Sequence, residues 1–373
     1  MPRASSFFYI YYFSALHSLF LINYFFSSTI FSINSESMRK IHVFNPESDY
    51  ALAAGREYYT PPSQVVELRK NLSLIPAVYA SEGDIILLLD RGGDFGSLAG
   101  YDSVEAKGLT IVDRDGLHSL LDGDEVFIAE PWGWNYTIRQ QLSDYSDIII
   151  NFPTIEHIDR LRELSHRRTT IDFLRHMSPV LETEIQLPKE MTDPEECVEA
   201  FCQNNYLFFK APWSSSGRGI LSTEGLDEKR ITPWVTGIIR RQGSVIMEKG
   251  YRRRLDFATE WMCTDGKATF LGYSIFRVSH RGRYQGNIEG SNEELEEKIR
   301  RVSGKWDRHY LDYQRDAIEV LIAPDYDGPL GIDMLITDEG NIHPCVEINL
   351  RHTMGMLSHL DRYYNKSAHS ITI

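Results

Sequence analysis

The sequence predicts an α/β protein in which a small parallel-sheet domain is followed by a larger α+β half. Three observations predict this. Between residues 38 and 153, short apolar runs alternate with helix-compatible segments. After residue 164, strand-like runs follow one another with fewer helices between them. Two strand-like runs joined by a polar turn close the core of the chain, and 373 residues suffice for more than one hydrophobic core.

The first domain is expected over residues 38–153. Its predicted strands are short apolar runs closed by turn residues, and they fall at 41–44, 85–89, 126–129 and 148–150. A polar segment compatible with a helix separates the last two runs. Strands that alternate with helices usually lie parallel, because a parallel pair needs a long crossover connection.

The second domain is expected over residues 154–373 and begins with helical spacing of apolar residues at 154–165. Predicted strands follow at 207–210, 244–248, 257–262 and 269–277, and predicted helices at 295–301 and 306–322. A glycine-rich segment at 282–290 indicates a mobile loop that closes over a site. The final hairpin pairs residues 330–336 with 342–350.

Charge and cysteine usage exclude some classes of function. The chain has 39 Lys and Arg against 53 Asp and Glu, a net charge of −14, so no nucleic-acid partner is expected. The four cysteines form no CxxC pair, which favours a reduced, cytoplasmic setting over a disulfide framework.

Residues 1–37 are an apolar extension with three interpretations. The run at 7–31 is long enough for a membrane anchor. A signal peptide is less consistent with it, because a strongly basic start and a clear cleavage site are missing. The third interpretation is a start codon assigned too early, since Met38 directly precedes a predicted strand. If the extension is an anchor, Arg39 and Lys40 would hold the following domain on the cytoplasmic side.

The final hairpin carries the sharpest chemical signal. Strict alternation along its second strand puts the polar side chains on one face, namely His343, Cys345, Glu347, Asn349 and Arg351. Asp333 stands on the partner strand between apolar residues. Two carboxylates and an amide are hard oxygen ligands that suit Mg²⁺. The alternative is a polar face exposed to solvent, which hairpins commonly have.

Gly331-Ile332-Asp333, followed after a turn by Val346-Glu347-Ile348-Asn349, resembles the metal-binding hairpin of the ATP-grasp superfamily. Residues 354–360 look like the same region of D-alanine–D-alanine ligases, and the Glu-x-Asn-x-Arg order is similar to the carboxylase and carbamoyl-phosphate branches. The resemblance covers about residues 164–360. It implies a two-subdomain ATP-grasp fold that uses ATP and Mg²⁺, or Mn²⁺ in its place, with Asp333, Glu347 and Asn349 as metal ligands.

The resemblance also implies a set of nucleotide-binding residues, in the expected order along the chain. Lys210 and the small-residue turn after it would meet the phosphates, since glycine lets backbone N–H groups approach closely. A plain loop is the alternative for that turn, a salt bridge for Asp256, and a strand cap for Glu248. The implied residues are Arg168 (or Arg167 beside it), Lys210, Ser215, Ser216, Gly217, Gly219, the hinge residues Met247 and Glu248, and Asp256 at the ribose.

Two arginines are the candidate catalytic residues. Arg277 ends a predicted strand and would meet the γ-phosphate, with a surface ion pair as the alternative. Arg351 shares the face of Asn349, and its fork of donors matches a carboxylate or an acyl phosphate. The alternative is that Arg351 ends the strand and forms an ion pair with a carboxylate at the surface.

Departures from the D-alanine ligase pattern argue against a D-alanine substrate. Gly331 stands where those enzymes commonly have an arginine, and their proline-glycine after the metal asparagine is missing. Substrate recognition is expected from two loops of the first domain, 44–50 and 130–135, because open α/β sheets bind ligands beyond the carboxyl ends of their strands. Plain loop packing is the alternative.

The expected activity is that of an ATP- and Mg²⁺-dependent ligase. It would activate a small-molecule or peptide carboxylate as an acyl phosphate for attack by an amine or a thiol. A small-molecule kinase and a non-catalytic nucleotide-binding module are the alternatives. Neither G-x-G-x-x-G nor the P-loop pattern occurs, which argues against a dehydrogenase or a P-loop ATPase. The sequence leaves the oligomeric state open.

Overall fold

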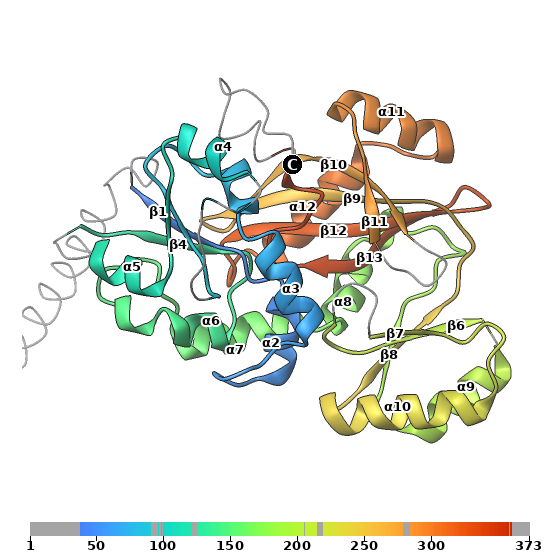
Figure 1. Ribbon diagram of the computed structural model, residues 1–373. Helices are drawn as coiled ribbons and strands as arrows, with labels where there is room; N and C mark the ends of the chain where they lie inside the picture. The colour runs from blue at the N-terminus through green and yellow to red at the C-terminus, as the bar shows by residue number, and fades with distance from the viewer. Residues whose placement is uncertain are drawn as a thin grey trace, which may run out of the picture.

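The computed structural model describes residues 38–90, 96, 98, 100–120, 125–204, 206–214, 219–278, 284–357 and 359. The apolar run at 7–31 lies outside the described residues. The strands form three sheets, with orders β3-β2-β1-β4, β5-β8-β6-β7 and β11-β10-β9-β12-β13 (Figure 1). In the described part of the chain, no helix has the length and apolar character needed to cross a bilayer.

The first sheet is parallel, as predicted. Its strands are β1 (Lys40–Val43), β2 (Ile85–Leu87), β3 (Thr110–Val112) and β4 (Ile128–Pro131), and β1 pairs with both β2 and β4. The strand predicted at 148–150 is wrong, since only an isolated bridge joins Phe127 to Ile149. The backbone N–H groups of Ile148 and Ile149 instead donate to Tyr145 O in a turn, and so they cannot extend a ladder.

Short helices connect these strands. Asn135 caps α6 by accepting from the N–H groups of Thr137 and Ile138, and Thr154 caps α7 in the same way through His157. The α-helices of this part are α2 (Ser48–Ala54), α3 (Ser63–Asn71), α4 (Tyr101–Ala106), α5 (Arg114–Leu120), α6 (Tyr136–Gln141) and α7 (Ile155–Leu164), with short 3₁₀ turns at Ile75–Val78 and Ser143–Tyr145.

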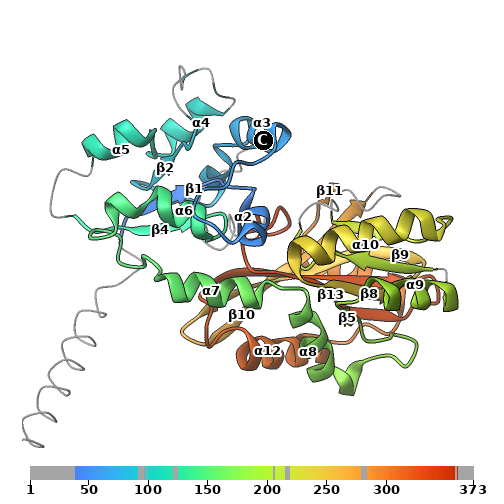
Figure 2. The same cartoon turned by 90° about the horizontal axis from the view of Figure 1, so that it is seen from below.

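The second sheet is antiparallel and small. Its strands are β5 (Lys189–Met191), β6 (Leu207–Lys210), β7 (Ile220–Ser222) and β8 (Val245–Lys249). The helices α9 (Pro194–Gln203) and α10 (Glu228–Gln242) cover its outer face (Figure 2). A separate hydrophobic core lies between these two helices and the second sheet, and it includes Cys197, Phe209, Ile231 and Val235.

The third sheet contributes the largest core. Its strands are β9 (Arg253–Thr264), β10 (Lys267–Val278), β11 (Tyr284–Ile288), β12 (Gly328–Thr337) and β13 (Ile342–Asn349), all antiparallel. The helices covering it are α8 (Arg168–His176), α11 (Asn292–Ser303) and α12 (His309–Leu321), with a 3₁₀ turn at Ser178–Val180. Figure 2 shows α8 and α12 beneath this sheet, on the side away from α10. Residues 284–288, predicted to be loop, are a strand because their backbone pairs with the edge of β10.

The hairpin of β12 and β13 departs from strict alternation. Asp333 faces Glu347, but two residues further along β12 Leu335 faces His343, so β13 carries two extra residues between these pairs. Cys345 therefore lies in the core with Ile348, and its predicted place on the polar face is wrong. The carbonyl of Pro344 in this irregular stretch accepts from Gln314 Nε2 at 3.0 Å.

Candidate active site

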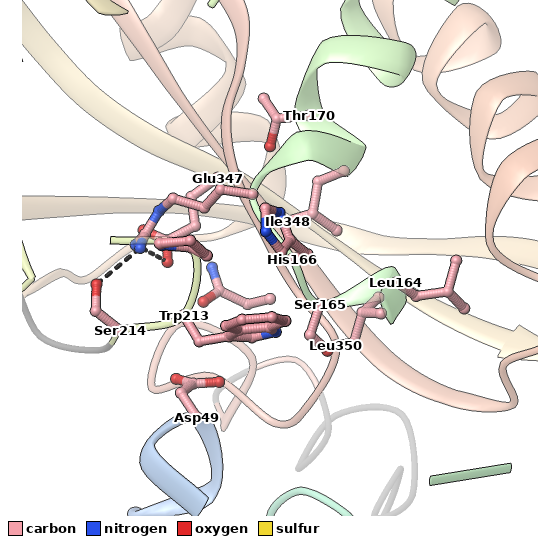
Figure 3. Close-up of a pocket in the computed structure, with 13 residues that line it drawn as sticks. Asp49, Leu164, Ser165, His166, Thr170, Trp213, Ser214, Glu347, Ile348 and Leu350 are labelled. Atoms are coloured by element: carbon pink, nitrogen blue, oxygen red, sulfur yellow. Dashed lines mark hydrogen bonds and ion pairs between the residues drawn. The ribbon is translucent and has the colours of Figure 1, made fainter. Parts of the chain in front are cut away.

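A pocket forms where the second and third sheets meet α2 (Figure 3). Its walls come from α2, the residues from the end of α7 into α8, the segment after β6, and the end of β13. Figure 3 shows Asp49 approaching from α2 toward the side of the pocket that holds Ser214 and Glu347. The lining residues are Asp49, Leu164, Ser165, His166, Arg167, Thr170, Pro212, Trp213, Ser214, Glu347, Ile348, Asn349 and Leu350.

The three predicted metal ligands lie together. Asp333 and Glu347 are opposite each other in the hairpin, and Asn349 stands two residues after Glu347 on the same strand. Burial raises the pKa of Asp333 well above its usual range, and the negative charges of Glu347 and Glu260 raise it further. Such crowding of acidic groups suits a cation.

Among the described residues, no group of three or more His, Cys, Asp or Glu side chains is placed to hold a metal ion. The donor set at the hairpin is smaller, namely two carboxylates and one amide. This set fits Mg²⁺ in a nucleotide complex, because that ion binds through one or two carboxylates and takes other oxygens from water and phosphate.

Two cations at or beside the pocket, Arg167 and Lys210, are each paired with an acid. Arg167 Nη2 lies 2.5 Å from Glu347 Oε1, and Lys210 Nζ lies 2.5 Å from Glu248 Oε2. Lys210 also contacts the carbonyl of Val346 at 3.4 Å. Both cations are nearly fully buried, so a bound phosphate would have to compete with these carboxylates for them.

The structure places Arg167, rather than Arg168, in the pocket. Arg167 Nη1 donates to the carbonyl of Ala211 and to Ser214 Oγ, each at 2.7 Å. The side chain of Arg168 is 55% exposed and lies 3.4 Å from Glu190, outside the pocket lining. The two residues are adjacent at the start of α8, so their side chains leave the backbone in different directions.

The phosphate-loop prediction falls partly outside the described residues. Ser215, Ser216 and Gly217 are among the residues left out. Gly219 is described, and its carbonyl accepts from the N–H of Ala211 at 2.7 Å. A Cβ on Gly219 would collide with the side chain of Ser214, so only glycine permits this close approach.

The hinge and ribose predictions lie on β8 and β9. Met247 and Glu248 follow one another on β8, where Glu248 pairs with Lys210. Asp256 is partly buried on β9 and pairs with Arg253 at 3.3 Å, which is the alternative role considered for it. Burial is the main cause that raises the pKa of Asp256.

The two candidate catalytic arginines have different surroundings. Arg277 is exposed on β10 and does not line the pocket. Arg351 is held from three sides. Its Nε and Nη2 lie 3.0 and 2.9 Å from Asp49 Oδ2, and Nη2 also donates to Asn349 Oδ1 at 2.9 Å. Its Nη1 donates to the carbonyl of His352 at 3.1 Å.

The segment after β13 contacts residues that flank the strands of the first sheet. In the order β3-β2-β1-β4, successive strands are added on one side of β1 and then on the other. Open sheets commonly bind ligands at this reversal of strand order, which lies here between β1 and β4. Here the N–H of His352 donates to Trp132 O at 2.9 Å, and its ring stacks on Tyr79 with centroids 4.8 Å apart. Gly133 permits this contact, since a Cβ would collide with Ser48 Oγ and crowd Arg351.

Sequence reasoning missed His166 and the partnership of Asp49 with Arg351. His166 is 2% exposed and packs edge-on against Trp213, with ring centroids 4.6 Å apart. Burial, followed by the charges of nearby arginines, lowers its pKa to about 3. Asp49 and Arg351 are 302 positions apart in the chain, so only the fold brings them together.

No protein-family model matches this sequence, and neither does any curated protein. Solved structures do match. The biotin carboxylase–β,γ-ATP complex from Campylobacter jejuni is 12% identical, with a TM-score of 0.53 over 89% of this chain and 71% of that one. The biotin carboxylase domain of the Hydrogenobacter thermophilus 2-oxoglutarate carboxylase, crystallised with MgADP, ADP and bicarbonate, is 12% identical with a TM-score of 0.50, over 90% and 71%.

A third match is an ATP-grasp superfamily protein from Archaeoglobus fulgidus, 12% identical, with a TM-score of 0.46 and 88% of each chain covered. The arrangement of helices with one parallel and two antiparallel sheets is the one expected from the sequence. The chain has the ATP-grasp fold.

Proposed function

We propose that this chain, which has the ATP-grasp fold, is an ATP- and Mg²⁺-dependent ligase that joins a carboxylate to an amine or a thiol. One observation carries the proposal. Glu347 and Asn349 line a pocket together with the buried Arg167 and the carboxylate of Asp49, and Asp333 lies opposite Glu347 in the hairpin. A plain solvent-exposed hairpin face would need neither the burial nor these partners.

The residues present fit a divalent cation and a triphosphate. Asp333, Glu347 and Asn349 would hold Mg²⁺, which would withdraw charge from the phosphoryl group being transferred. Arg167 and Lys210 would then exchange their carboxylate partners for phosphate oxygens, and the turn at 214–219 would offer backbone N–H groups. Met247 and Glu248 would meet the base and Asp256 the ribose, whereas Arg168 and Arg277 do not line the pocket.

Arg351 would hold the substrate carboxylate in line with the phosphoryl group. Its guanidinium is fixed in direction by Asp49, Asn349 and the carbonyl of His352. The substrate carboxylate would attack the terminal phosphorus, ADP would leave, and the amine or thiol would displace phosphate from the acyl phosphate. Positioning and electrostatics would supply most of the acceleration.

The test is ADP release by the full chain with Mg-ATP, screened over amino acids, peptides and small acids with and without amines or thiols. With an active substrate pair, Glu347→Gln should lower turnover by about 1,000-fold or more, since it removes charge that acts on the transferred group. Its circular dichroism spectrum and melting temperature should show a folded protein. Wild-type turnover in Glu347→Gln would refute the metal assignment, and a phosphorylated product that never couples would indicate a kinase.

A further inference from the structure

His166 has a buried hydrogen-bond donor with no acceptor. Its Nδ1 accepts from the backbone N–H of Arg168 at 2.9 Å, so the neutral ring carries its proton on Nε2. Among the described residues, that Nε2 has no hydrogen-bond partner. Glu190 Oε1 is 3.6 Å away, beyond hydrogen-bonding range, and already accepts from Ser244 Oγ at 2.6 Å.

A second donor without an acceptor lies beside the first. Arg167 Nε is buried and has no hydrogen-bond partner among the described residues, although both terminal nitrogens of that side chain are bonded. His166 and Arg167 line the same pocket. Leaving buried donors unpaired is unfavourable, so two of them at one pocket indicate a ligand with several acceptor oxygens.

The neighbours of this pair identify which oxygens those are. The guanidinium of Arg167 contacts Glu347, a proposed metal ligand, and Ser214, the first residue of the proposed phosphate turn. A phosphoryl group that shares a cation with Glu347 would lie in the pocket that His166 and Arg167 also line. The ring of His166 is held by its contact with Trp213 and by the N–H of Arg168, so it need not reorganise on binding.

We propose that His166, through Nε2–H, is a further ligand-binding residue that recognises the terminal phosphoryl group of the bound nucleoside triphosphate. The inference rests on the proposed function. A neutral imidazole adds a directed donor without adding charge, next to an arginine that already supplies it. Burial lowers the pKa of His166 to about 3, so this donor stays neutral around neutral pH.

Two substitutions separate the two ring nitrogens. His166→Asn keeps an acceptor near the position of Nδ1 and removes the donor, whereas His166→Gln puts an amide N–H near the position of Nε2. Titration calorimetry of the full chain would compare Mg-AMP-PNP, an unreactive triphosphate, with Mg-ADP. His166→Asn should weaken AMP-PNP binding by about 10-fold or more and ADP binding by less than about 2-fold. His166→Gln should restore most of the AMP-PNP affinity.

Other results would overturn the inference. If His166→Asn left the AMP-PNP affinity unchanged, or weakened both nucleotides equally, His166 would have a structural role while the proposed function stood. If Glu190→Gln reproduced the effect of His166→Asn, the ring would act through that carboxylate. If the wild-type chain bound neither nucleotide with Mg²⁺, the proposed function and this inference would fail together.

Discussion

Two buried histidines, one on β1 and one in the pocket, have different surroundings. His42 on β1 has Asp84 Oδ2 3.0 Å from Nε2, while its Nδ1 lies 3.4 Å from Glu130 Oε2 and, among the described residues, has no hydrogen-bond partner. His166 has a backbone N–H at one nitrogen and no acceptor within hydrogen-bonding range at the other. Burial and an unpaired ring nitrogen are therefore common to both histidines. They differ in place, because His166 lines the pocket and His42 does not.

The network around His42 holds the first sheet together. Asp84 accepts from the backbone N–H groups of Lys40 and Ser81 as well as from His42, and Lys40 Nζ pairs with Glu130 at 2.6 Å. These contacts join β1, β2 and β4. The pairs Arg167–Glu347 and Arg351–Asp49 instead join segments that are far apart in the chain, and Arg167 would exchange its partner with a ligand.

The largest effect on stability should follow from Asp84→Asn. The substitution leaves the charge of the buried network uncompensated, and breaking a buried pair typically destabilises by about 3–5 kcal/mol. Urea unfolding would measure this change. Nucleotide affinity of the folded fraction should stay within about 2-fold, because Asp84 does not line the pocket. A large loss of nucleotide affinity with little loss of stability would contradict the distinction between a structural network around His42 and a ligand-binding pocket.

The largest effect on binding should follow from Arg167→Met, matched with Arg168→Met. Arg167→Met removes charged hydrogen bonds inside the pocket, and Mg-AMP-PNP affinity should fall by about 100-fold. Arg168→Met removes a half-exposed charge outside it, and the change should be within about 3-fold. Calorimetry of both variants measures the difference. The reverse ranking would show that Arg168 turns into the site when the nucleotide binds.

A smaller effect is expected at Gly133, where the two regions meet. Gly133→Ala puts a methyl group against Ser48 and Arg351, and overpacking of this kind costs about 1–3 kcal/mol. Because Arg351 must shift, turnover should fall more than Mg-ADP affinity does. Thermal unfolding and steady-state kinetics would measure both. Gly225, around which a Cβ meets nothing within 4 Å but whose φ is +71°, is a control for backbone strain without crowding.

The smallest expected effect is a dependence of stability on pH from Asp84. Desolvation opposes ionisation of this carboxylate, but its bonds with His42, Lys40 and Ser81 outweigh it and lower its pKa in the folded state. A lowered folded pKa gives stability that is present above the unfolded pKa of about 3.9 and is lost as the pH falls through the folded value. The acid limb of the stability curve should therefore flatten in Asp84→Asn. An unchanged acid limb would contradict this.

Local pattern in the sequence determined much of the second half. Residue spacing predicted the α12 helix and the hairpin, and two-residue periodicity placed Glu347 and Asn349 on one face opposite Asp333. These features depend on neighbours a few positions apart, which the sequence records directly. The irregular stretch of β13 is the exception. There the carbonyl of Pro344 accepts from Gln314 on α12 and Cys345 lies in the core, and no local pattern predicted either contact.

Tertiary structure alone decided the rest of the site. Which of two adjacent arginines enters the pocket depends on the packing of α8, and the proton position on His166 depends on the N–H of Arg168. The pairing of Asp49 with Arg351 joins α2 to the segment after β13. The sequence by itself specified the chemical groups and their local faces, because those are set by short-range geometry. Their partners were set by contacts between segments far apart in the chain, which no local pattern encodes.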